Sequence, residues 1–209
     1  MISGIVLAAG GSERMGRSKL RLPVSGGTVL SRPVSALLDA PLDRVVVVLG
    51  GDAELLRQTL PEDGRLLPVR NGEWREGMSS SLRKGVQACF DSDAAVIALG
   101  DQPGLTAARV RSVLAGFRPE RSLVVPVHGG VPAHPVLFAR SLFPELLALT
   151  GDEGARAVVR RHWEEALKIE MEPLVDVDTE ADYERFLKAE GSRRAPPSPR
   201  GEREGKRRQ

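Results

Sequence analysis

The 209-residue sequence contains a single cysteine, Cys89, and aromatic residues make up only 4% of the chain. One cysteine excludes a disulfide framework within the chain and is typical of a reducing compartment. No apolar run approaches the roughly 18 residues that a membrane helix needs, and the first residues show no charged lead-in to an apolar signal region. We therefore expect a cytoplasmic protein that does not enter a membrane.

Excess positive charge is confined to one end of the sequence. The formal net charge is +2, but residues 189–209 hold seven Lys or Arg and three Glu, and removing their +4 leaves −2 for residues 1–188. The end segment is rich in Pro, Gly and Ser and lacks the apolar residues needed to order itself. We expect a folded domain over 1–188 and a basic, disordered tail over 189–209. Because the folded part is mildly acidic, we expect it to bind no nucleic acid.

Apolar stretches alternate with helical patterns along the folded part. We expect strands over 2–9, 44–50, 66–70, 94–100, 122–127, 135–139 and 167–172, and helices over 30–40, 52–59, 79–90, 106–117, 142–149, 152–164 and 180–189, with Ser79, Thr106 and Thr179 as N-caps. Continuous apolar strands alternating with helices predict an α/β fold with a doubly wound, mostly parallel sheet in three layers. Ligands of such sheets bind at the carboxyl ends of the strands.

The first strand leads into a loop with several glycines and cations, "LAAGGSERMGRSKL" (7–20). A dinucleotide fingerprint would require glycine where the chain has Ser12. A P-loop would require lysine directly after the second glycine, but Arg17 stands there and the lysine is Lys19. The pattern that remains is a long glycine-rich loop whose amides line an anion, with Arg14 and Lys19 reaching in.

This segment resembles the L-A-[AG]-G-x-S-x-R-M-G-x-x-K signature of the MobA-like nucleotidyltransferases. Further segments resemble later motifs of that family, in order: "NGEWREGMSSSLRKGVQA" (71–88), "VIALGDQPGLT" (96–106), "AHPVLFARSLFPELLALTGDEGAR" (133–156) and "VDVDTEADY" (175–183). The last two look like the molybdenum cofactor cytidylyltransferase branch. The resemblance covers residues 2 to about 188 and implies a Rossmann-like fold of the nucleotide-diphospho-sugar transferase type.

The resemblance implies transfer of CMP from CTP to the terminal phosphate of molybdenum cofactor (molybdopterin), with release of pyrophosphate. It implies Mg²⁺ or Mn²⁺ as the metal, CTP and molybdenum cofactor as substrates, and a molybdenum hydroxylase as the client enzyme. Three alternatives stay open. They are guanylyl or another nucleotidyl transfer, an oxidoreductase (since some MobA-like chains have been assigned to dye reduction), and a carrier that holds the cofactor without catalysis.

Two anions must approach each other in such a transfer, so the site needs cations and a metal. The resemblance assigns catalysis to Arg14, Lys19 and Asp101, and we expect the Lys19 side chain to face solvent until substrate binds. Asp101 ends an apolar strand and is the expected metal ligand. A second carboxylate should come from "VDVDT", where Asp176 and Asp178 alternate so that only one faces the site. Asp178 is the choice because it adjoins an expected helix cap.

Nucleotide contacts are expected from the end of the first strand, the loop after it and the first turn of a later helix: Leu7, Ala8, Ala9, Gly10, Gly11, Ser12, Gly16, Gly77, Ser80 and Ser81. The guanylyltransferase branch resembles L-A-G-G at the end of the strand, where this chain has Ala9. The added methyl group should narrow the floor beneath the base and favour cytosine over guanine.

Acceptor contacts are less sharply indicated. His134 is expected to meet the phosphate or the pterin of the acceptor, although Ala133 stands where the branch usually carries glycine. Trp74 either lines the acceptor pocket or packs in the interior. Asp152 and Arg156 have i, i+4 spacing and are expected to pair on a helix, with acceptor binding as the weaker interpretation.

Overall fold

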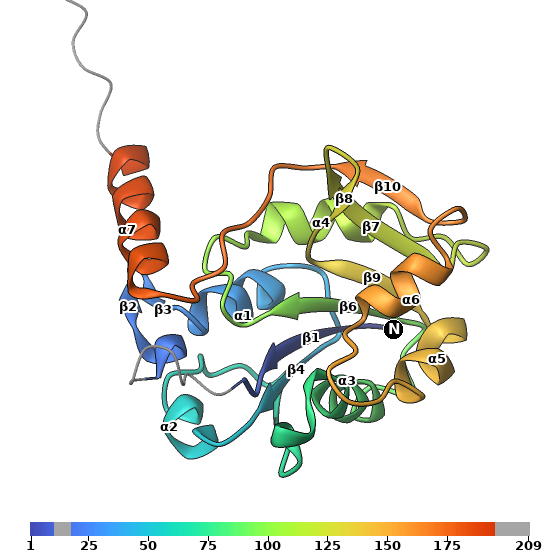
Figure 1. The fold of residues 1–209 in the computed structure, drawn as a ribbon, viewed down its shortest axis with the longest axis horizontal. Helices are drawn as coiled ribbons and strands as arrows, with labels where there is room; N and C mark the ends of the chain where they lie inside the picture. The colour runs from blue at the N-terminus through green and yellow to red at the C-terminus, as the bar shows by residue number, and fades with distance from the viewer. Residues whose placement is uncertain (11–17, 195–209) are drawn as a thin grey trace, which may run out of the picture.

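The computed structural model describes residues 1–10 and 18–194, and its central feature is a mixed sheet of eight strands (Figure 1). The described residues form ten strands in all, of which β2 and β3 lie outside this sheet. They are β1 (Ile2–Ala8), β2 (Pro23–Val24), β3 (Gly27–Thr28), β4 (Arg44–Leu49), β5 (Leu66–Arg70), β6 (Ala94–Leu99), β7 (Leu123–His128), β8 (Val131–Pro132), β9 (Val136–Ala139) and β10 (Leu167–Glu170). The sheet order is β10-β7-β9-β6-β1-β4-β5, and β8 pairs with β7. Strands β2 and β3 form a separate hairpin.

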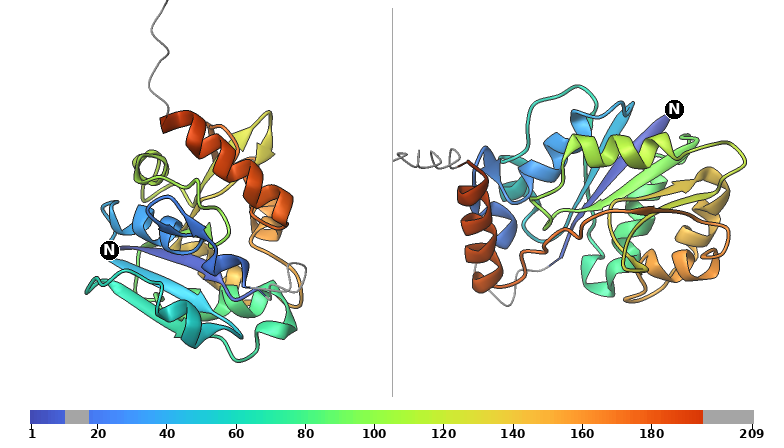
Figure 2. Two further views of the ribbon diagram at one scale, coloured as in Figure 1. Left: turned by 90° about the vertical axis from the view of Figure 1, so that its left-hand side faces the viewer. Right: turned by 90° about the horizontal axis from the view of Figure 1, so that it is seen from above.

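Helices cover both faces of this sheet, as Figure 2 shows. They are α1 (Ser31–Leu38), α2 (Ala53–Arg57), α3 (Met78–Gln87), α4 (Ala107–Ala115), α5 (Phe143–Leu147), α6 (Arg156–Arg161) and α7 (Glu180–Arg194), with 3-10 turns η2 (Lys19–Arg21), η3 (Trp74–Glu76) and η4 (Arg140–Leu142). One apolar cluster joins α1, α4 and α7 to the sheet, and a second joins α3, α5 and α6 to its other face. The predicted three-layer α/β fold is therefore confirmed.

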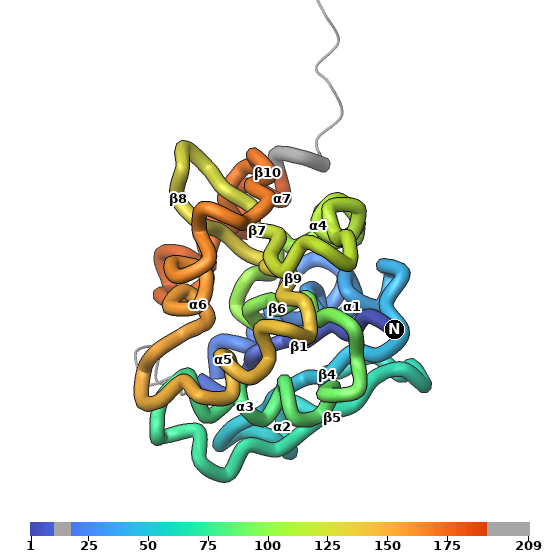
Figure 3. The backbone as a smooth tube through the Cα atoms, turned by 90° about the vertical axis from the view of Figure 1, so that its right-hand side faces the viewer, coloured from blue at the N-terminus to red at the C-terminus, as the bar shows by residue number. Residues whose placement is uncertain are grey.

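Strand direction places the site. Strands β4, β1 and β6 are parallel neighbours, whereas β9 runs antiparallel between β6 and β7. The chain goes from β1 outward to β4 and β5, and then returns to add β6 on the opposite side of β1. Figure 3 shows the resulting row, with β10 and β7 toward the top and β5 toward the bottom. The strand order thus switches between β1 and β6, which is where α/β sheets bind ligands.

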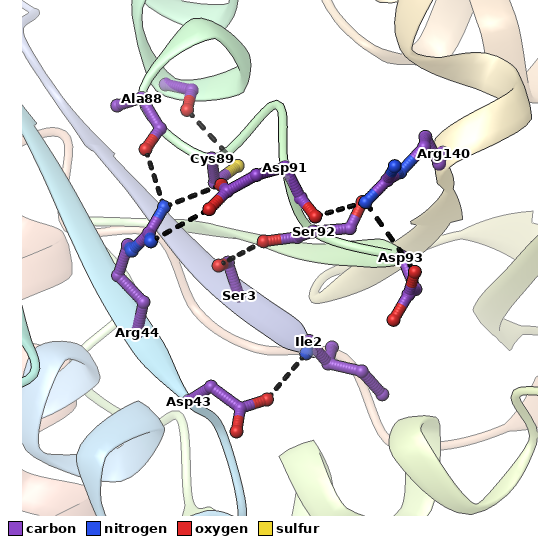
Figure 4. A network of polar contacts seen from close by, with 11 residues as sticks. Ile2, Ser3, Asp43, Arg44, Ala88, Cys89, Asp91, Ser92, Asp93 and Arg140 are labelled. Atoms are coloured by element: carbon purple, nitrogen blue, oxygen red, sulfur yellow. Dashed lines mark hydrogen bonds and ion pairs between the residues drawn. The ribbon is translucent and has the colours of Figure 1, made fainter.

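The opposite, amino-terminal end of these strands is fastened by polar contacts (Figure 4). Arg44 of β4 forms two hydrogen bonds with the Asp91 carboxylate, at 2.8 and 3.1 Å, and a third with the Ala88 carbonyl. The buried hydroxyls of Ser3 and Ser92 lie 2.7 Å apart. These contacts join β1, β4 and the turn before β6 at the end remote from the switch point.

Most of the predicted elements are present, with shorter or longer ends. The helix expected over 152–164 is limited to α6, and the one expected over 180–189 runs on to Arg194. Thr106 and Thr179 cap their helices as predicted, since each side chain accepts a hydrogen bond from the amide three residues on. The prediction of Ser79 as a cap was wrong, because Gly77 is the N-cap of α3.

Among the described residues, no helix is long and apolar enough to cross a membrane.

Candidate active site

Three charged side chains meet at the switch point. The Lys19 ammonium lies 2.8 Å from Asp101 Oδ2 and 2.6 Å from Asp178 Oδ1. Lys19 comes from η2, Asp101 from the turn after β6, and Asp178 from the segment that precedes α7. The fold therefore joins residues that are 82 and 159 positions apart. We call these three residues the lysine–carboxylate cluster.

The cluster fixes the charge of its lysine. Burial by itself would lower the pKa of Lys19, but the charges and hydrogen bonds of Asp101 and Asp178 outweigh it, so the pKa is raised above its usual value. The side chain is only 13% exposed, which contradicts the expectation that it faces solvent before substrate binds. The carboxylates of Asp101 and Asp178 attract the Lys19 ammonium to a partly buried position, and their charges compensate for its desolvation.

The backbone decides which aspartate joins the cluster. The Val177 amide donates to the Asp101 carbonyl at 2.9 Å, which fixes the extended segment beside the end of β6. Asp178 then reaches Lys19, while Asp176 accepts a hydrogen bond from Gln102 at 2.7 Å. Burial raises the pKa of Asp176, and the nearby charge of Asp101 adds to the effect. The two side chains thus have different partners, and Asp178 is the one that contacts Lys19. The reason expected from the sequence was wrong, because residues two positions apart on an extended segment share a face.

A cavity of about 580 Å³ opens beside the cluster. It is lined by Leu7, Ala9, Gly10, Trp74, Arg75, Gly77, Met78, Ser81, Leu99, Asp101 and Asp152. Seven of these are residues that the sequence assigned to the site. Ala8 is not among them, because its methyl group packs into the opposite apolar cluster, so only its backbone could meet a ligand. Arg14, Gly11, Ser12 and Gly16 lie outside the described residues, and their roles stay predictions.

The two serines of α3 are held by a buried asparagine. Asn71, which is fully buried, donates from Nδ2 to the hydroxyls of Ser80 and Ser81 at 2.8 and 3.1 Å. Ser80 also donates to the Gly77 carbonyl, so its hydroxyl is engaged on both sides and does not line the cavity. Ser81 does line it. Asn71 was missed as a positioning residue, although the "NGEW" turn was part of the quoted motif.

Gly77 brings the loop over 149–152 against the start of α3. Its φ is 108°, and a Cβ atom there would lie 2.3 Å from the Gly151 carbonyl oxygen and 2.6 Å from Asp152 Oδ1. Ser79 then bonds the Gly151 carbonyl from both its amide, at 3.1 Å, and its hydroxyl, at 2.7 Å. This close approach of two backbone segments carries the Asp152 side chain to the cavity wall.

Asp152 does not pair with Arg156 along a helix as expected. It lies in the turn before α6, which begins only at Arg156, so helical spacing does not apply to the two residues. Asp152 lines the cavity instead, together with Arg75, Met78 and Leu99, which the sequence did not single out. All three lie within the quoted motif segments, which was the only signal for them in the sequence.

The two expected acceptor residues differ in position. Trp74 lines the cavity and also packs closely over Gly51, while the Arg75 guanidinium lies 4.3 Å from the centre of its ring. Trp74 therefore lines the cavity and also packs against a neighbour, and its contact with an acceptor stays a prediction. His134 does not line the cavity, and its Nδ1 has no hydrogen-bond partner among the described residues. Burial lowers the pKa of His134 to about 4. The imidazole is neutral at pH 7, so it has no charge with which to bind a phosphate.

The metal-binding capacity of the cluster rests on few oxygen atoms. Asp101 Oδ2 meets Lys19, whereas the buried Asp101 Oδ1 has no hydrogen-bond partner among the described residues. Within residues 1–10 and 18–194, no group of three or more His, Cys, Asp or Glu is placed to hold a metal alone. Two carboxylates suit a Mg²⁺ or Mn²⁺ ion that also binds phosphate oxygens, which commonly complete such a coordination shell.

Comparison with known proteins gives this geometry a family context. Residues 4–166 match the model of the MobA-like NTP transferase domain. The chain is 33% identical over 174 residues to nicotine blue oxidoreductase of Paenarthrobacter nicotinovorans, covering 77% of this chain and 82% of that protein. It is 26% identical over 183 residues to the molybdenum cofactor cytidylyltransferase of Escherichia coli K12, covering 87% and 93%.

The fold is also similar to a solved structure that contains a metal. The crystal structure of Rv0371C from Mycobacterium tuberculosis H37Rv in complex with manganese superposes with a TM-score of 0.74 at 30% identity. The similarity covers 90% of this chain and 98% of the other. A relative at this level of identity has therefore been crystallised with a divalent metal.

Proposed function

Because the chain belongs to the MobA-like NTP transferase family, we propose that it transfers CMP from CTP to the terminal phosphate of molybdenum cofactor. The lysine–carboxylate cluster beside the 580 Å³ cavity carries this proposal. It brings a retained positive charge and two metal-type carboxylates to the carboxyl ends of β1 and β6, next to the wall of Ala9, Gly10 and Ser81. Those are the groups that a triphosphate and its base require.

The reaction is a substitution at phosphorus. An oxygen of the acceptor phosphate attacks the α-phosphorus of CTP, the bond from that phosphorus to the β-phosphate oxygen breaks, and pyrophosphate leaves with the bonding electrons. The Lys19 ammonium, kept protonated by its carboxylates, is a described cation placed to stabilise the charge that builds up on the phosphates. Arg14 is proposed to add a second positive charge from the glycine-rich loop.

Asp101 and Asp178 are proposed to hold the Mg²⁺ or Mn²⁺ ion. A bound divalent ion would neutralise triphosphate oxygens and thereby permit the approach of two anions. The unpartnered Asp101 Oδ1 supports this assignment, because a buried carboxylate oxygen without a donor is costly unless a ligand satisfies it. Lys19 would exchange part of its contact with the two carboxylates for contact with the phosphates.

Base selection is proposed to rest on the floor of the cavity. Ala9 lines the cavity and is 4% exposed. Its methyl group is proposed to oppose the larger guanine ring. Ser81 is oriented by Asn71 and supplies a hydroxyl on the same wall. CTP is accordingly the proposed nucleotide, and GTP is the main alternative within the family.

Incubation with labelled CTP, Mg²⁺ and molybdenum cofactor tests the proposal. Pyrophosphate release together with a CMP adduct of the cofactor is expected, and both should disappear without the divalent metal. An adduct formed from GTP in preference would replace the cytidylyl assignment by a guanylyl one. Cofactor retained without turnover would indicate a carrier, and the client hydroxylase could then be sought by transfer of the retained cofactor.

The 33% identity to nicotine blue oxidoreductase favours a second candidate, reduction of a dye. In that case a reduced nicotinamide would deliver a hydride to the dye, which takes up a proton to complete its reduction. The sequence lacks the dinucleotide fingerprint, since Ser12 stands at the middle glycine position. Oxidation of NADH or NADPH that depends on a quinone-like dye, measured without CTP, would support this candidate against nucleotidyl transfer.

A further inference from the structure

A second cavity, of about 590 Å³, lies between α4, residues 172–175 and α7. It shares no lining residue with the candidate active site. Most of its wall is apolar and comes from Gly104, Pro173, Leu174, Val175, Phe186 and Ala189. A volume of this order, with an apolar wall and a few polar groups, is usual for sites that bind small molecules.

Arg109, in the first turn of α4, supplies an unsatisfied cation to this cavity. Its Nε and Nη2 atoms are out of contact with solvent and have no hydrogen-bond acceptor among the described residues. Burial lowers the pKa of Arg109, and the neighbouring Glu172 charge opposes the shift. A partly buried guanidinium without an acceptor costs folding free energy, which a bound anion would recover.

The other charged groups of the lining are largely engaged elsewhere. Arg185 pairs with Asp182 on its own helix. Glu190 accepts from Arg32 at 2.9 Å and from the Ser25 amide at 3.2 Å. Glu172 is exposed to solvent. Arg109 is therefore the lining cation that, among the described residues, has no ion pair to give up when an anion enters.

We propose that this cavity binds an apolar monocarboxylate. The Nε and Nη2 atoms form one edge of the guanidinium, and that edge matches the two oxygens of a carboxylate through parallel hydrogen bonds. The apolar body of the ligand would lie against Leu174, Val175 and Phe186. Because both nitrogen atoms are covered, the Arg109 side chain must rotate toward the cavity as the carboxylate enters.

Occupation of this site would also reach the candidate active site. Leu174 and Val175 line the cavity, and the same extended segment continues through Val177, bonded to the Asp101 carbonyl, to Asp178 of the lysine–carboxylate cluster. A ligand packed on one side of this segment would restrict its motion. The proposal does not depend on which nucleotide, if any, the chain transfers.

Calorimetric titration of the full chain with octanoate, 1-octanol and octylammonium tests the site. These probes share one apolar chain and differ in the head group. Saturable binding of octanoate is expected, with octanol weaker by about tenfold or more, as for loss of a hydrogen-bonded charge pair. Octylammonium should not bind. Equal binding of octanoate and octylammonium, or no binding of octanoate, would overturn the proposal.

Two variants separate the arginine from its surroundings. Arg109→Met should weaken octanoate binding by about tenfold or more while leaving octanol unchanged. Glu172→Gln, which removes the opposing charge on the rim, should retain or tighten octanoate binding. Without ligand, Arg109→Met should melt no lower than the wild type, because it removes an unsatisfied cation. Unchanged octanoate affinity of Arg109→Met would refute the role of Arg109.

Hydrogen exchange supplies a readout that does not require the variant to fold. Octanoate should slow amide exchange over residues 172–178 in the wild-type chain, and octylammonium should not. Protection confined to the lining of the first cavity would mean that octanoate binds at the candidate active site instead, against the proposal.

Discussion

At the scale of single residues, Lys19 shows how a binding group is stored before its ligand arrives. Its ammonium is shared by the carboxylates of Asp101 and Asp178 in the described structure, and the same charge is proposed to meet the triphosphate. The two carboxylates hold the proton on the lysine and also hold the side chain at the site. Removing the lysine therefore leaves two neighbouring carboxylates without their shared cation.

Lys19→Ala is expected to lower nucleotidyl transfer by on the order of 10²-fold or more. It should also destabilise the fold by about 1–3 kcal/mol at pH 7, since two partly buried carboxylates lose their shared cation. The pKa of Lys19 is raised in the folded state, so its stabilisation is present below the unfolded pKa and is lost as the pH rises through the folded one.

Denaturant unfolding of the wild type and of Lys19→Ala from pH 7 to above 11 measures the difference in their free energies of unfolding. That difference should persist to about pH 10.5 and then shrink. Arg21→Ala is the matched control, because Arg21 is an exposed cation in the same 3-10 turn. Equal losses of stability and of transfer activity in Lys19→Ala and Arg21→Ala would contradict this prediction. They would mean that any nearby positive charge has the effect assigned to the lysine–carboxylate cluster.

His134 predicts a second pH effect with the opposite sign. Its pKa is about 4 in the folded protein against an ordinary 6.5, so the unfolded chain takes up the proton first as the pH falls. The stability linked to His134 is full above about pH 6.5 and decreases toward pH 4, by up to about 3 kcal/mol. His134→Gln should flatten the decline of unfolding free energy in this window. If the unfolding free energies of the wild type and of His134→Gln fall in parallel over this pH range, the assignment of this effect to His134 is wrong.

Ala9 is the residue on which the proposed choice of base depends. A misfit of one methyl group is worth roughly 10- to 200-fold in discrimination, so a CTP over GTP preference of that order in kcat/KM is expected. Ala9→Gly should relax the preference. Ala8→Gly is the control, since the Ala8 methyl faces the opposite apolar cluster and should leave the ratio unchanged. The measurement is a competition between CTP and GTP at equal concentration, in which the masses of the products give the ratio of CMP to GMP adduct.

At the scale of elements, one glycine joins two segments that form the cavity wall. Gly77→Ala would place a methyl group within 2.3 Å of a backbone oxygen at a positive φ, which is expected to cost about 1–3 kcal/mol or more. The loop over 149–152 should then separate from α3, with loss of the Asp152 position and of activity.

Gly72→Ala is the matched control for this substitution, because an added Cβ there meets nothing within 4 Å and no positive φ is involved. Melting temperatures and hydrogen exchange over residues 149–152 measure the difference. If both variants have the melting temperature of the wild type, the close approach at Gly77 has no energetic role.

The sequence predicted elements well where one residue pattern determines them. The apolar runs of β1, β4 and β6 and the caps at Thr106 and Thr179 are local signals, and all are confirmed. Ser79 failed as a cap because the positive φ of Gly77 turns the chain two residues earlier and commits the Ser79 hydroxyl to Gly151. The hairpin of β2 and β3 is too short to leave an apolar pattern.

The site was predicted in parts and not as an arrangement. Motif resemblance singled out Lys19 and Asp101, and Asp178 was chosen for its place beside an expected helix cap. The mutual contact of the three depends on how η2 and the segment before α7 converge, which no local pattern contains. The same applies to Asn71, whose role depends on two serines from α3. Burial of Lys19 was missed because a lysine in a glycine-rich loop is usually solvated unless carboxylates approach it from elsewhere.

At the scale of the whole molecule, the formal charge is distributed unevenly along the chain. The formal charge of +2 comes from the end segment, and the part that forms the sheet and its helices is slightly acidic. A site for triphosphates on such a body depends on local cations such as Lys19 and not on the overall field. The stated boundary at residue 188 between domain and tail remains a prediction, and α7 extends beyond it to Arg194.

Two truncations locate the functional end of the chain. Removing residues 195–209 is expected to leave the melting temperature and turnover unchanged, since the composition of that stretch gives it nothing to bury. Removing residues 189–209 is expected to lower stability by about 1–3 kcal/mol, because Glu190 binds Arg32 and the Ser25 amide while 17% exposed. Glu190→Gln in the full chain should reproduce most of that loss. If the shorter truncation alone abolishes nucleotidyl transfer, the basic tail belongs to the site, and the expectation that it has no role in catalysis is wrong.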